Sequence, residues 1–224
     1  IARRMENALE ALTRWISGLT EWGFSCAFGL AWRRRNGFGW GMAKIPALFL
    51  DRDGTIIFDK HHIHDPRDVR LVPEAAPALA AARDAGYKLF ILTNQSGIGR
   101  GYFTWEQYAS CNARMLELLG LGADLFTEIK AAPEVPGELS LYRKPSPRFI
   151  EEMVAKHGLD PAQCWMIGDR QSDWEAGLAA GIGGAAVRTG KPIEAAEEIF
   201  LREKNVPVFA GLADFVRDAL GLRF

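Results

Sequence analysis

The chain has 224 residues, of which 48% are hydrophobic and 25% are charged, and its formal net charge is −1. These values are typical of a globular protein with one full hydrophobic core, in one large domain or two small ones. The nearly balanced charge gives no electrostatic reason to expect nucleic acid as a partner. No apolar run approaches the roughly 18 residues that a membrane span needs, so we expect no membrane span.

The three cysteines, Cys26, Cys111 and Cys164, are scattered along the chain and form no Cys-x-x-Cys pair. An odd and sparse count argues against a disulfide framework and fits a reducing compartment. We therefore expect a cytoplasmic protein, with Cys164 as a packed thiol in an apolar strand. We also expect it to be a monomer.

The first 41 residues differ in composition from the rest, with four of the seven tryptophans and six arginines against three acids. Apolar residues at helical spacing between Leu9 and Leu19 would suit a basic amphipathic helix that binds a membrane surface or a partner. We favour a poorly ordered tail, or sequence upstream of the true start, because the regular pattern begins only at Met42. The predicted division is an N-terminal extension over residues 1–41 and one domain over residues 42–224.

Short apolar runs after Ile45 alternate with helical patterns. Most of these runs show no polar alternation, as expected for strands covered on both faces. The predicted strands are 47–50, 88–93, 125–129, 164–168 and 184–189, and the predicted helices are about 74–85, 104–120, 147–157 and 172–181, with a last strand and helix in 207–220. The alternation predicts an α/β fold, namely a Rossmann-like, doubly wound and mainly parallel sheet with helices on both faces.

The helix predicted over 104–120 has a clear start, because Thr104 is followed three residues later by Gln107, which is a capping box. Four of its residues lie at helical spacing and are expected to face the core. They are Trp105, Tyr108, Met115 and Leu119.

Polar residues follow several predicted strands at the point where each strand ends. In open parallel sheets the carboxyl ends of the strands meet at one edge, and ligands bind there. We therefore expect acids, a hydroxyl and a lysine to converge at this edge. The set is Asp51, Asp53, Thr93, Asn94 and Asp169, joined by Arg143 and Lys144 from the segment RKPSP.

This set suits phosphoryl transfer. Clustered carboxylates repel one another unless a cation lies among them, and carboxylate oxygens beside a phosphate suit Mg²⁺. Asp51 could attack phosphorus and form an aspartyl-phosphate, while Asp53 handles the proton. Lys144 and the Thr93 hydroxyl could stabilise the charge of the transferred group, and Gly54 lets the chain turn sharply behind the acids.

The segments DRDGT, LTNQSG, RKPSP and GDRQSD, in this order and spacing, resemble the four motifs of the haloacid-dehalogenase-like phosphatase superfamily over about residues 45–192. FLDRDGTI, TNQSGIGRG and VRTGKP are similar to the branch that contains D-glycero-D-manno-heptose 1,7-bisphosphate 7-phosphatases and histidinol phosphatases. The resemblance implies a phosphatase of a small phosphorylated metabolite. The expected substrate is the heptose bisphosphate, with histidinol phosphate as the alternative.

The resemblance also implies a role for each residue of the set. Asp51 would be the nucleophile, and Asp53 the general acid and then the general base. Asp173 would support the metal site without touching the ion. Mg²⁺ would be held by the Asp51 carboxylate, the Asp53 main-chain carbonyl and Asp169, the phosphoryl group would be bound by Thr93 and Asn94 and neutralised by Lys144, and Arg143 would contact the substrate.

Two features of the sequence bear on whether the protein has a structural zinc or a cap domain, which such enzymes can carry. The segment AAPEVPGELSLY before Arg143 has no cysteine or histidine, so we expect none of the structural zinc common in the heptose-bisphosphate branch. Only 18 residues separate Gly54 from Pro73, and 12 separate Lys130 from Arg143. Neither gap can hold a cap domain, because domains start near ~50 residues. We expect an open site.

The loop DKHHIHDPRD over residues 59–68 is the expected substrate-facing loop. Its histidines, His61, His62 and His64, favour solvated or substrate-contacting roles over a metal site, because no cysteines accompany them. Arg100 in the segment GIGRG could reach substrate or lie on the surface.

The sequence favours hydrolysis over three other functions. A phospho-accepting signalling domain also places an aspartate at a strand end, but the second acid, Asp53, favours rapid hydrolysis over a lasting phosphorylated state. A nucleic-acid 3′-phosphatase is disfavoured because the chain has no basic stripe. A phosphotransferase such as a mutase would need a cap to exclude water, and no cap fits.

Overall fold

The computed structural model describes residues 44–224. The extension predicted over residues 1–41 lies outside them, so its predicted disorder and the predicted domain boundary stay predictions. In the described part of the chain, no helix has the length and apolar composition that crossing a bilayer requires.

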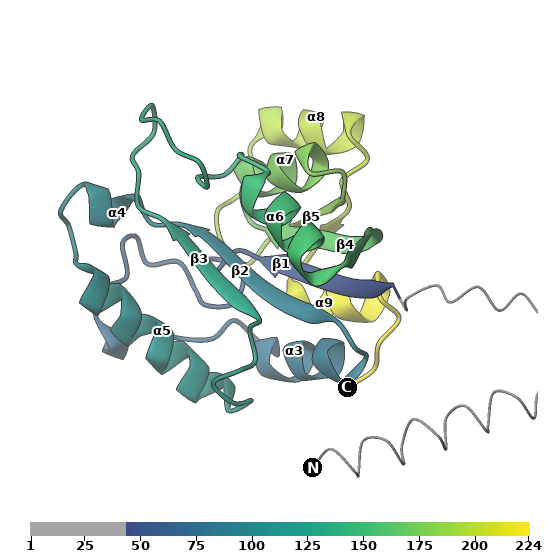
Figure 1. Cartoon of the computed structure of the whole chain (residues 1–224), viewed down its shortest axis with the longest axis horizontal. Coiled ribbons are helices and arrows are strands. Elements are labelled where there is room, and N and C mark those ends of the chain that lie inside the picture. The colour runs from purple at the N-terminus through teal and green to yellow at the C-terminus, as the bar shows by residue number, and fades with distance from the viewer. Residues whose placement is uncertain (1–43) are drawn as a thin grey trace, which may run out of the picture. The chain divides into compact units, whose positions relative to one another are not determined.

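A parallel sheet forms the centre of the fold (Figure 1). The strand order is β3-β2-β1-β4-β5-β6. Chain direction across the sheet reverses between β1 and β4, and this switch point is where α/β sheets bind ligands. The strands are β1 (Ile45–Leu50), β2 (Lys88–Asn94), β3 (Glu128–Ala132), β4 (Leu159–Gly168), β5 (Gly183–Val187) and β6 (Val208–Phe209).

Helices cover both faces of the sheet, as Figure 1 shows. One face carries α3 (Ala75–Asp84), α5 (Trp105–Leu119) and α9 (Leu212–Asp218), and the other carries α6 (Arg148–His157), α7 (Gln171–Ala179) and α8 (Ala195–Glu203). A short helix α4 (Ser96–Gly99) follows β2, and a 3₁₀ helix η1 (Pro66–Asp68) lies in the segment after β1. The predicted Rossmann-like fold is confirmed.

The segments in which a cap could be inserted are short. The chain between β1 and α3 contains turns, isolated β-bridges and η1, and residues 133–147 between β3 and α6 contain neither helix nor strand. The fold therefore has no cap domain in the described residues, as the sequence predicted.

Register aligns the ends of the central strands. Leu50 of β1 pairs with Ile91 of β2 and with Ile167 of β4. The main-chain N–H of Asp51 then donates to the Ile167 carbonyl at 2.9 Å. The residues that follow β1 and β4 therefore lie next to each other at one edge.

Helix α5 starts as predicted. The Gln107 N–H donates to the Thr104 hydroxyl at 3.3 Å, and the Thr104 N–H donates to the Gln107 side-chain oxygen at 2.9 Å. Tyr108, Met115 and Leu119 are buried as predicted, but the prediction for Trp105 is wrong, because this side chain is 48% exposed. Trp105 lies in the first turn of α5, outside the buried cluster, where its ring makes a T-shaped contact with the ring of Tyr108.

Two further predictions can be compared with the structure. Cys164 is buried in β4, as expected for a packed thiol, and neither it nor Cys111 is in a disulfide. The third strand begins at Glu128 and not at Leu125. Leu125 and Phe126 are buried in the crossover ahead of the strand, so their apolar character reflects core packing and not strand structure.

Candidate active site

A polar crevice of about 220 Å³ opens at the carboxyl ends of β1 and β2, against the start of α7. Most of the residues predicted for the site line it. These are Asp51, Asp53, Thr93, Asn94, Arg143 and Lys144. Asp169 lies beside them, with a carboxylate oxygen within 4.8 Å of one from Asp51. The structure therefore brings together all seven predicted residues.

Asp51 lies directly after β1 and is only 5% exposed. Its Oδ1 atom accepts a hydrogen bond from the Arg52 N–H at 2.7 Å. The Lys144 Nζ atom lies 2.9 Å from the same oxygen. Two donors thus hold one carboxylate oxygen and fix the orientation of the side chain.

Lys144 is held from both its main chain and its side chain. The Asn94 amide accepts from the Lys144 N–H at 2.9 Å and donates to the Lys144 carbonyl at 3.1 Å. Its Nζ atom lies 2.6 Å from Asp173 Oδ1 as well as beside Asp51. Burial disfavours the ammonium, but the attraction of Asp173 and Asp51 outweighs it and raises the pKa of Lys144. The Asn94 side chain therefore positions the lysine, a contact that the sequence did not indicate.

Three acids form a buried cluster: Asp51, Asp169 and Asp173 each place one oxygen within 4.8 Å of the others. Asp169 Oδ2 accepts from the Lys191 N–H at 2.8 Å, whereas Asp169 Oδ1 is buried without a hydrogen-bond partner in the described part of the chain. Burial, followed by the charges of Asp51 and Asp173, raises the pKa of Asp169 to about 7. A buried, unpartnered carboxylate oxygen beside further acids fits a hard divalent cation such as Mg²⁺.

Asp173 is fully buried, and both of its oxygens are engaged. Oδ1 pairs with Lys144, and Oδ2 accepts from the Arg170 N–H at 3.0 Å. Burial is the largest cause that raises its pKa, to about 6, although Lys144 opposes the shift. Since Asp169 keeps an oxygen free and Asp173 does not, Asp169 is the better placed of the two to hold a cation.

The glycine of DRDGT is required by backbone conformation and by space. Gly54 has φ +81°, in the left-handed region that favours glycine. A Cβ atom at this position would lie 2.6 Å from Asp169 Oδ2. The Gly54 carbonyl accepts from the Thr189 hydroxyl at 2.6 Å, which ties the turn to the loop after β5.

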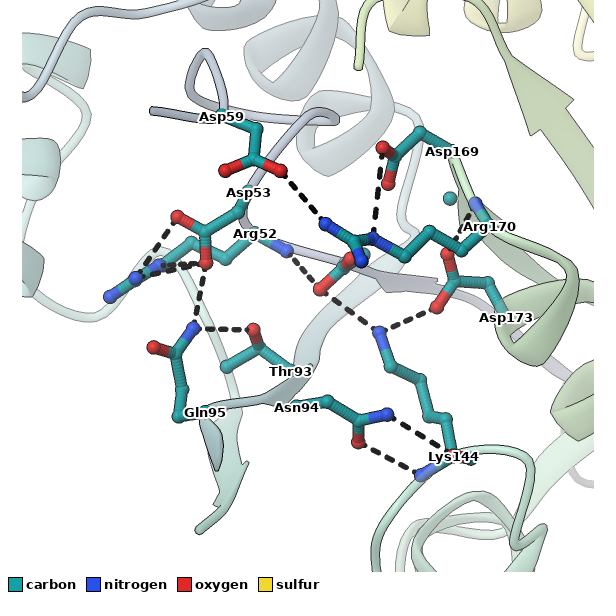
Figure 2. A network of polar contacts seen from close by, with 12 residues as sticks. Arg52, Asp53, Asp59, Thr93, Asn94, Gln95, Lys144, Asp169, Arg170 and Asp173 are labelled. Atoms are coloured by element: carbon teal, nitrogen blue, oxygen red, sulfur yellow. Dashed lines mark hydrogen bonds and ion pairs between the residues drawn. The ribbon is translucent and has the colours of Figure 1, made fainter. Parts of the chain in front are cut away.

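A network of hydrogen bonds from Arg52 and Gln95 holds the Asp53 side chain (Figure 2). Its carboxylate accepts from the Arg52 guanidinium and, at 2.7 Å, from the Gln95 amide. The same amide donates to the Thr93 hydroxyl at 2.9 Å. Arg52 and Gln95, which were not predicted for the site, are buried polar residues inside the segments DRDGT and LTNQSG. Their position next to predicted site residues in the sequence could have identified them.

The loop over residues 59–68 lines the crevice with Asp59, His61, His62 and Ile63, whereas His64 does not line it. Figure 2 shows the Arg170 guanidinium between Asp59 and Asp169, and its Nη2 atom donates to Asp59 Oδ2 at 2.8 Å.

The two other arginines considered in the sequence differ in position. Arg143 lines the crevice, and its Nη1 atom also donates to the Glu134 carbonyl at 2.8 Å. Arg100 is exposed and does not line the crevice.

Comparisons with known proteins point to one family. A model of HAD-hydrolase-like proteins matches residues 141–215. A curated relative named D-glycero-beta-D-manno-heptose-1,7-bisphosphate 7-phosphatase, from Mesorhizobium japonicum, is 38% identical over 172 residues, which cover 69% of this chain and 79% of the relative.

Solved structures show the same likeness. The crystal structure of D,D-heptose 1,7-bisphosphate phosphatase from B. bronchiseptica, complexed with magnesium and phosphate, matches with a TM-score of 0.68 and 25% identity, over 78% of this chain and 98% of that one. A putative HAD-like phosphatase from Mesorhizobium loti matches with a TM-score of 0.61 and 33% identity, over 77% and 85% of the two chains. On the identity and coverage of these relatives, the chain belongs to the haloacid-dehalogenase-like hydrolases and is a phosphatase, an enzyme that hydrolyses phosphoric monoesters.

Proposed function

We propose that this phosphatase is Mg²⁺-dependent and removes the 7-phosphate of D-glycero-D-manno-heptose 1,7-bisphosphate through an aspartyl-phosphate on Asp51. The observation that supports the mechanism is the placement of Asp51 against a buried lysine, Lys144, within a cluster of acids in which Asp169 has one unpartnered oxygen. The names of the relatives support the choice of substrate.

In the first step an oxygen of Asp51 attacks phosphorus, and the bond between phosphorus and the sugar oxygen breaks with its electron pair on that oxygen. Asp53, in its protonated form, gives its proton to the departing oxygen and becomes a carboxylate. The product alcohol leaves, and the phosphoryl group stays on Asp51 as an acyl phosphate.

In the second step Asp53 accepts a proton from a water molecule as the water oxygen attacks phosphorus. The bond between phosphorus and the Asp51 oxygen breaks, and its electron pair regenerates the Asp51 carboxylate. Inorganic phosphate leaves, and Asp53 is again protonated for the next turnover. The two acids return to their starting states, as a catalyst requires.

The other residues stabilise charge and orient the reactants. Lys144 lies against Asp51, where its ammonium would neutralise oxygens of the transferred group. The Thr93 hydroxyl would donate to the same group. The Asn94 side-chain amide is hydrogen-bonded to the main chain of Lys144, so it would act by holding the lysine in place. Thr93 would then make the direct contact with the phosphate.

A Mg²⁺ ion would be held by the Asp51 carboxylate, the Asp53 main-chain carbonyl and Asp169. When bound, it supplies positive charge that stabilises the oxygens of the transferred phosphoryl group. Its charge would also offset the charges of Asp51 and Asp173, which together with the larger effect of burial raise the pKa of Asp169.

Substrate choice would depend on the short loops around the crevice, since no cap covers it in the described residues. Arg143 and the loop histidines His61 and His62 line the crevice wall and would contact the part of the substrate beyond the transferred phosphate.

Phosphate release from a panel of substrates tests the proposal. The panel contains both anomers of the heptose 1,7-bisphosphate, other phosphorylated sugars, histidinol phosphate and nucleotides. We expect the heptose bisphosphate to give the highest kcat/KM, with loss of the 7-phosphate and not of the phosphate on C1. A preference for histidinol phosphate would overturn the substrate but keep the mechanism. A stable phosphorylated protein without turnover would instead support a signalling domain.

A further inference from the structure

We propose that Arg52 is a positioning residue that holds the Asp53 carboxylate at the angle from which it transfers protons to and from groups on Asp51. This inference rests on the proposed function. It adds a residue that acts only by positioning Asp53 and does not itself exchange a proton or a phosphoryl group. It is drawn from the contacts of one buried guanidinium.

Arg52 is 1% exposed, although it carries a full positive charge. Burial of a charge is costly unless the charge is paired and hydrogen-bonded. Its single ion-pair partner in the described part of the chain is Asp53, at 2.9 Å from Nη2 to Oδ2. The hydrogen bonds that Asp53 accepts therefore offset the cost of burying Arg52, most fully when Asp53 is the carboxylate that acts as base.

The contact fixes an orientation as well as a charge. The Nε atom of Arg52 donates to Asp53 Oδ2 at 3.1 Å, while Nη2 donates to Oδ1 at 3.0 Å and to Oδ2 at 2.9 Å. Gln95 adds a donor to Oδ2 at 2.7 Å. Because the donors gather on Oδ2, Oδ1 keeps more lone-pair capacity, and Oδ1 is the oxygen that we expect to carry the proton.

Helix α5 holds the guanidinium from its other side. The Nη1 atom of Arg52 donates to the Asn112 side-chain oxygen at 2.9 Å, and the guanidinium carbon lies 4.9 Å from the centre of the Tyr108 ring. A planar fork bound on three sides has little freedom to rotate. Arg52 therefore connects Asp53 to helix α5, which carries none of the seven predicted site residues.

Arg52 also connects the two acids. Its main-chain N–H donates to Asp51 Oδ1 at 2.7 Å, while its side chain binds Asp53. Arg52 thus contacts both the proposed nucleophile and the proposed acid. A misplacement of about 1 Å in such a pair can lower a rate by roughly a hundredfold.

The alternative is that Arg52 only stabilises the fold. The two roles differ in their dependence on the leaving group. p-Nitrophenyl phosphate has a leaving group acidic enough to depart without a proton, so its first step does not need Asp53. The sugar oxygen of the heptose bisphosphate does need the proton, and the second step needs Asp53 with either substrate.

The experiment compares Arg52→Met with the wild type in rapid-quench assays on both substrates. With p-nitrophenyl phosphate we expect a burst of nitrophenol close to one per active site, phosphoenzyme on Asp51, and a steady state slower by roughly a hundredfold, the low end of general acid–base catalysis. With the heptose bisphosphate we expect at least the same loss and no burst. Arg52→Lys keeps the positive charge but lacks the planar guanidinium, and it should show the same pattern with a loss of about tenfold in the steady-state rate.

The matched control is Arg114→Met, which changes a half-buried arginine on α5 whose guanidinium pairs only with Glu117 in the described part of the chain. It should behave as the wild type does. If Arg52→Met protein is insoluble, Asn112→Ala removes the support from α5 and should give the same burst with a smaller loss, on the order of tenfold.

Equal losses on both substrates without phosphoenzyme would overturn the inference, and so would wild-type behaviour of Arg52→Met. So would an Asn112→Ala protein that shows no burst when Arg52→Met is insoluble. Failure of the proposed function is distinguishable, because it would appear in the wild type itself as the absence of label on Asp51.

Discussion

The raised pKa of Asp169 predicts that the metal-free protein becomes less stable as the pH rises. Its folded pKa of about 7 lies above the ordinary value of 3.8. Between these values the folded state keeps a proton that the unfolded state has lost. Stability from this proton is fully present below pH ~4 and is lost as the pH rises through ~7. Between pH 5 and pH 8 the expected loss is roughly 2 to 3 kcal/mol in the free energy of unfolding.

The Asp169→Asn variant isolates this effect, because asparagine stays neutral over the whole range and can still accept the hydrogen bond from Lys191. Urea unfolding of both proteins in chelator at pH 5 and pH 8 measures it. We expect the free energy of unfolding of the wild type, minus that of the variant, to fall by roughly 2 to 3 kcal/mol between these pH values. A difference that does not change with pH would refute the reasoning.

Addition of Mg²⁺ supplies the second half of the same test. A cation needs the ionised carboxylate, so proton and metal compete for Asp169. The affinity of the wild type for Mg²⁺, measured by titration calorimetry, should rise by about tenfold per pH unit below pH 7 and then level off. Asp169→Asn should bind Mg²⁺ weakly at every pH. An affinity that is independent of pH would show that Asp169 is not a ligand.

Three further outcomes follow. Gly54→Ala should lower kcat by about a hundredfold in a phosphate-release assay, because its Cβ would displace Asp169, and retained activity would contradict the crowding. Trp105→Ala should change the free energy of unfolding by less than about 1 kcal/mol in urea, whereas Met115→Ala, fully buried, should cost about 2–5 kcal/mol; equal costs would contradict the burial. EDTA should abolish phosphate release and Mg²⁺ restore it, and activity unaffected by chelator would exclude the metal.

The parts of the site that could be predicted from sequence are those fixed by local patterns. An apolar run that ends in a polar residue marks both a strand and its carboxyl end, and Asp51 and Asp169 are of this kind. In a parallel sheet such ends share one edge, so two residues far apart in sequence could be placed together without coordinates. The capping box at Thr104 was equally local.

Elements with a weak apolar pattern were missed or misplaced. Strand β3 lies at the sheet edge with the sequence EIKAA, while the apolar pair Leu125 and Phe126 ahead of it is buried in the crossover. Helix α8 has no counterpart among the predicted elements, and Leu201 is its only buried residue in the structure. In both cases the apolar residues reflect contacts with other elements and not the local conformation.

The contacts that position the site were not predictable, because they join residues across long stretches of chain. Arg52 meets Asn112 across 60 positions, and Asn94 meets Lys144 across 50. Asn94 and Lys144 were expected at the same edge of the sheet, but no periodicity or motif in one sequence gives the hydrogen bonds that join either pair. Burial converts these side chains from surface polar residues into fixed supports, and only the folded structure shows it.

The account depends most directly on Asp51 as the residue that receives phosphate. The wild-type protein with Mg²⁺ is mixed with the heptose bisphosphate, quenched in acid within the first turnover and digested, and the peptide that contains Asp51 is analysed by mass spectrometry. We predict an added phosphoryl group on Asp51, lost on mild base treatment, and neither label nor phosphate release in Asp51→Asn. Normal turnover by Asp51→Asn, or label on another residue, would contradict the account.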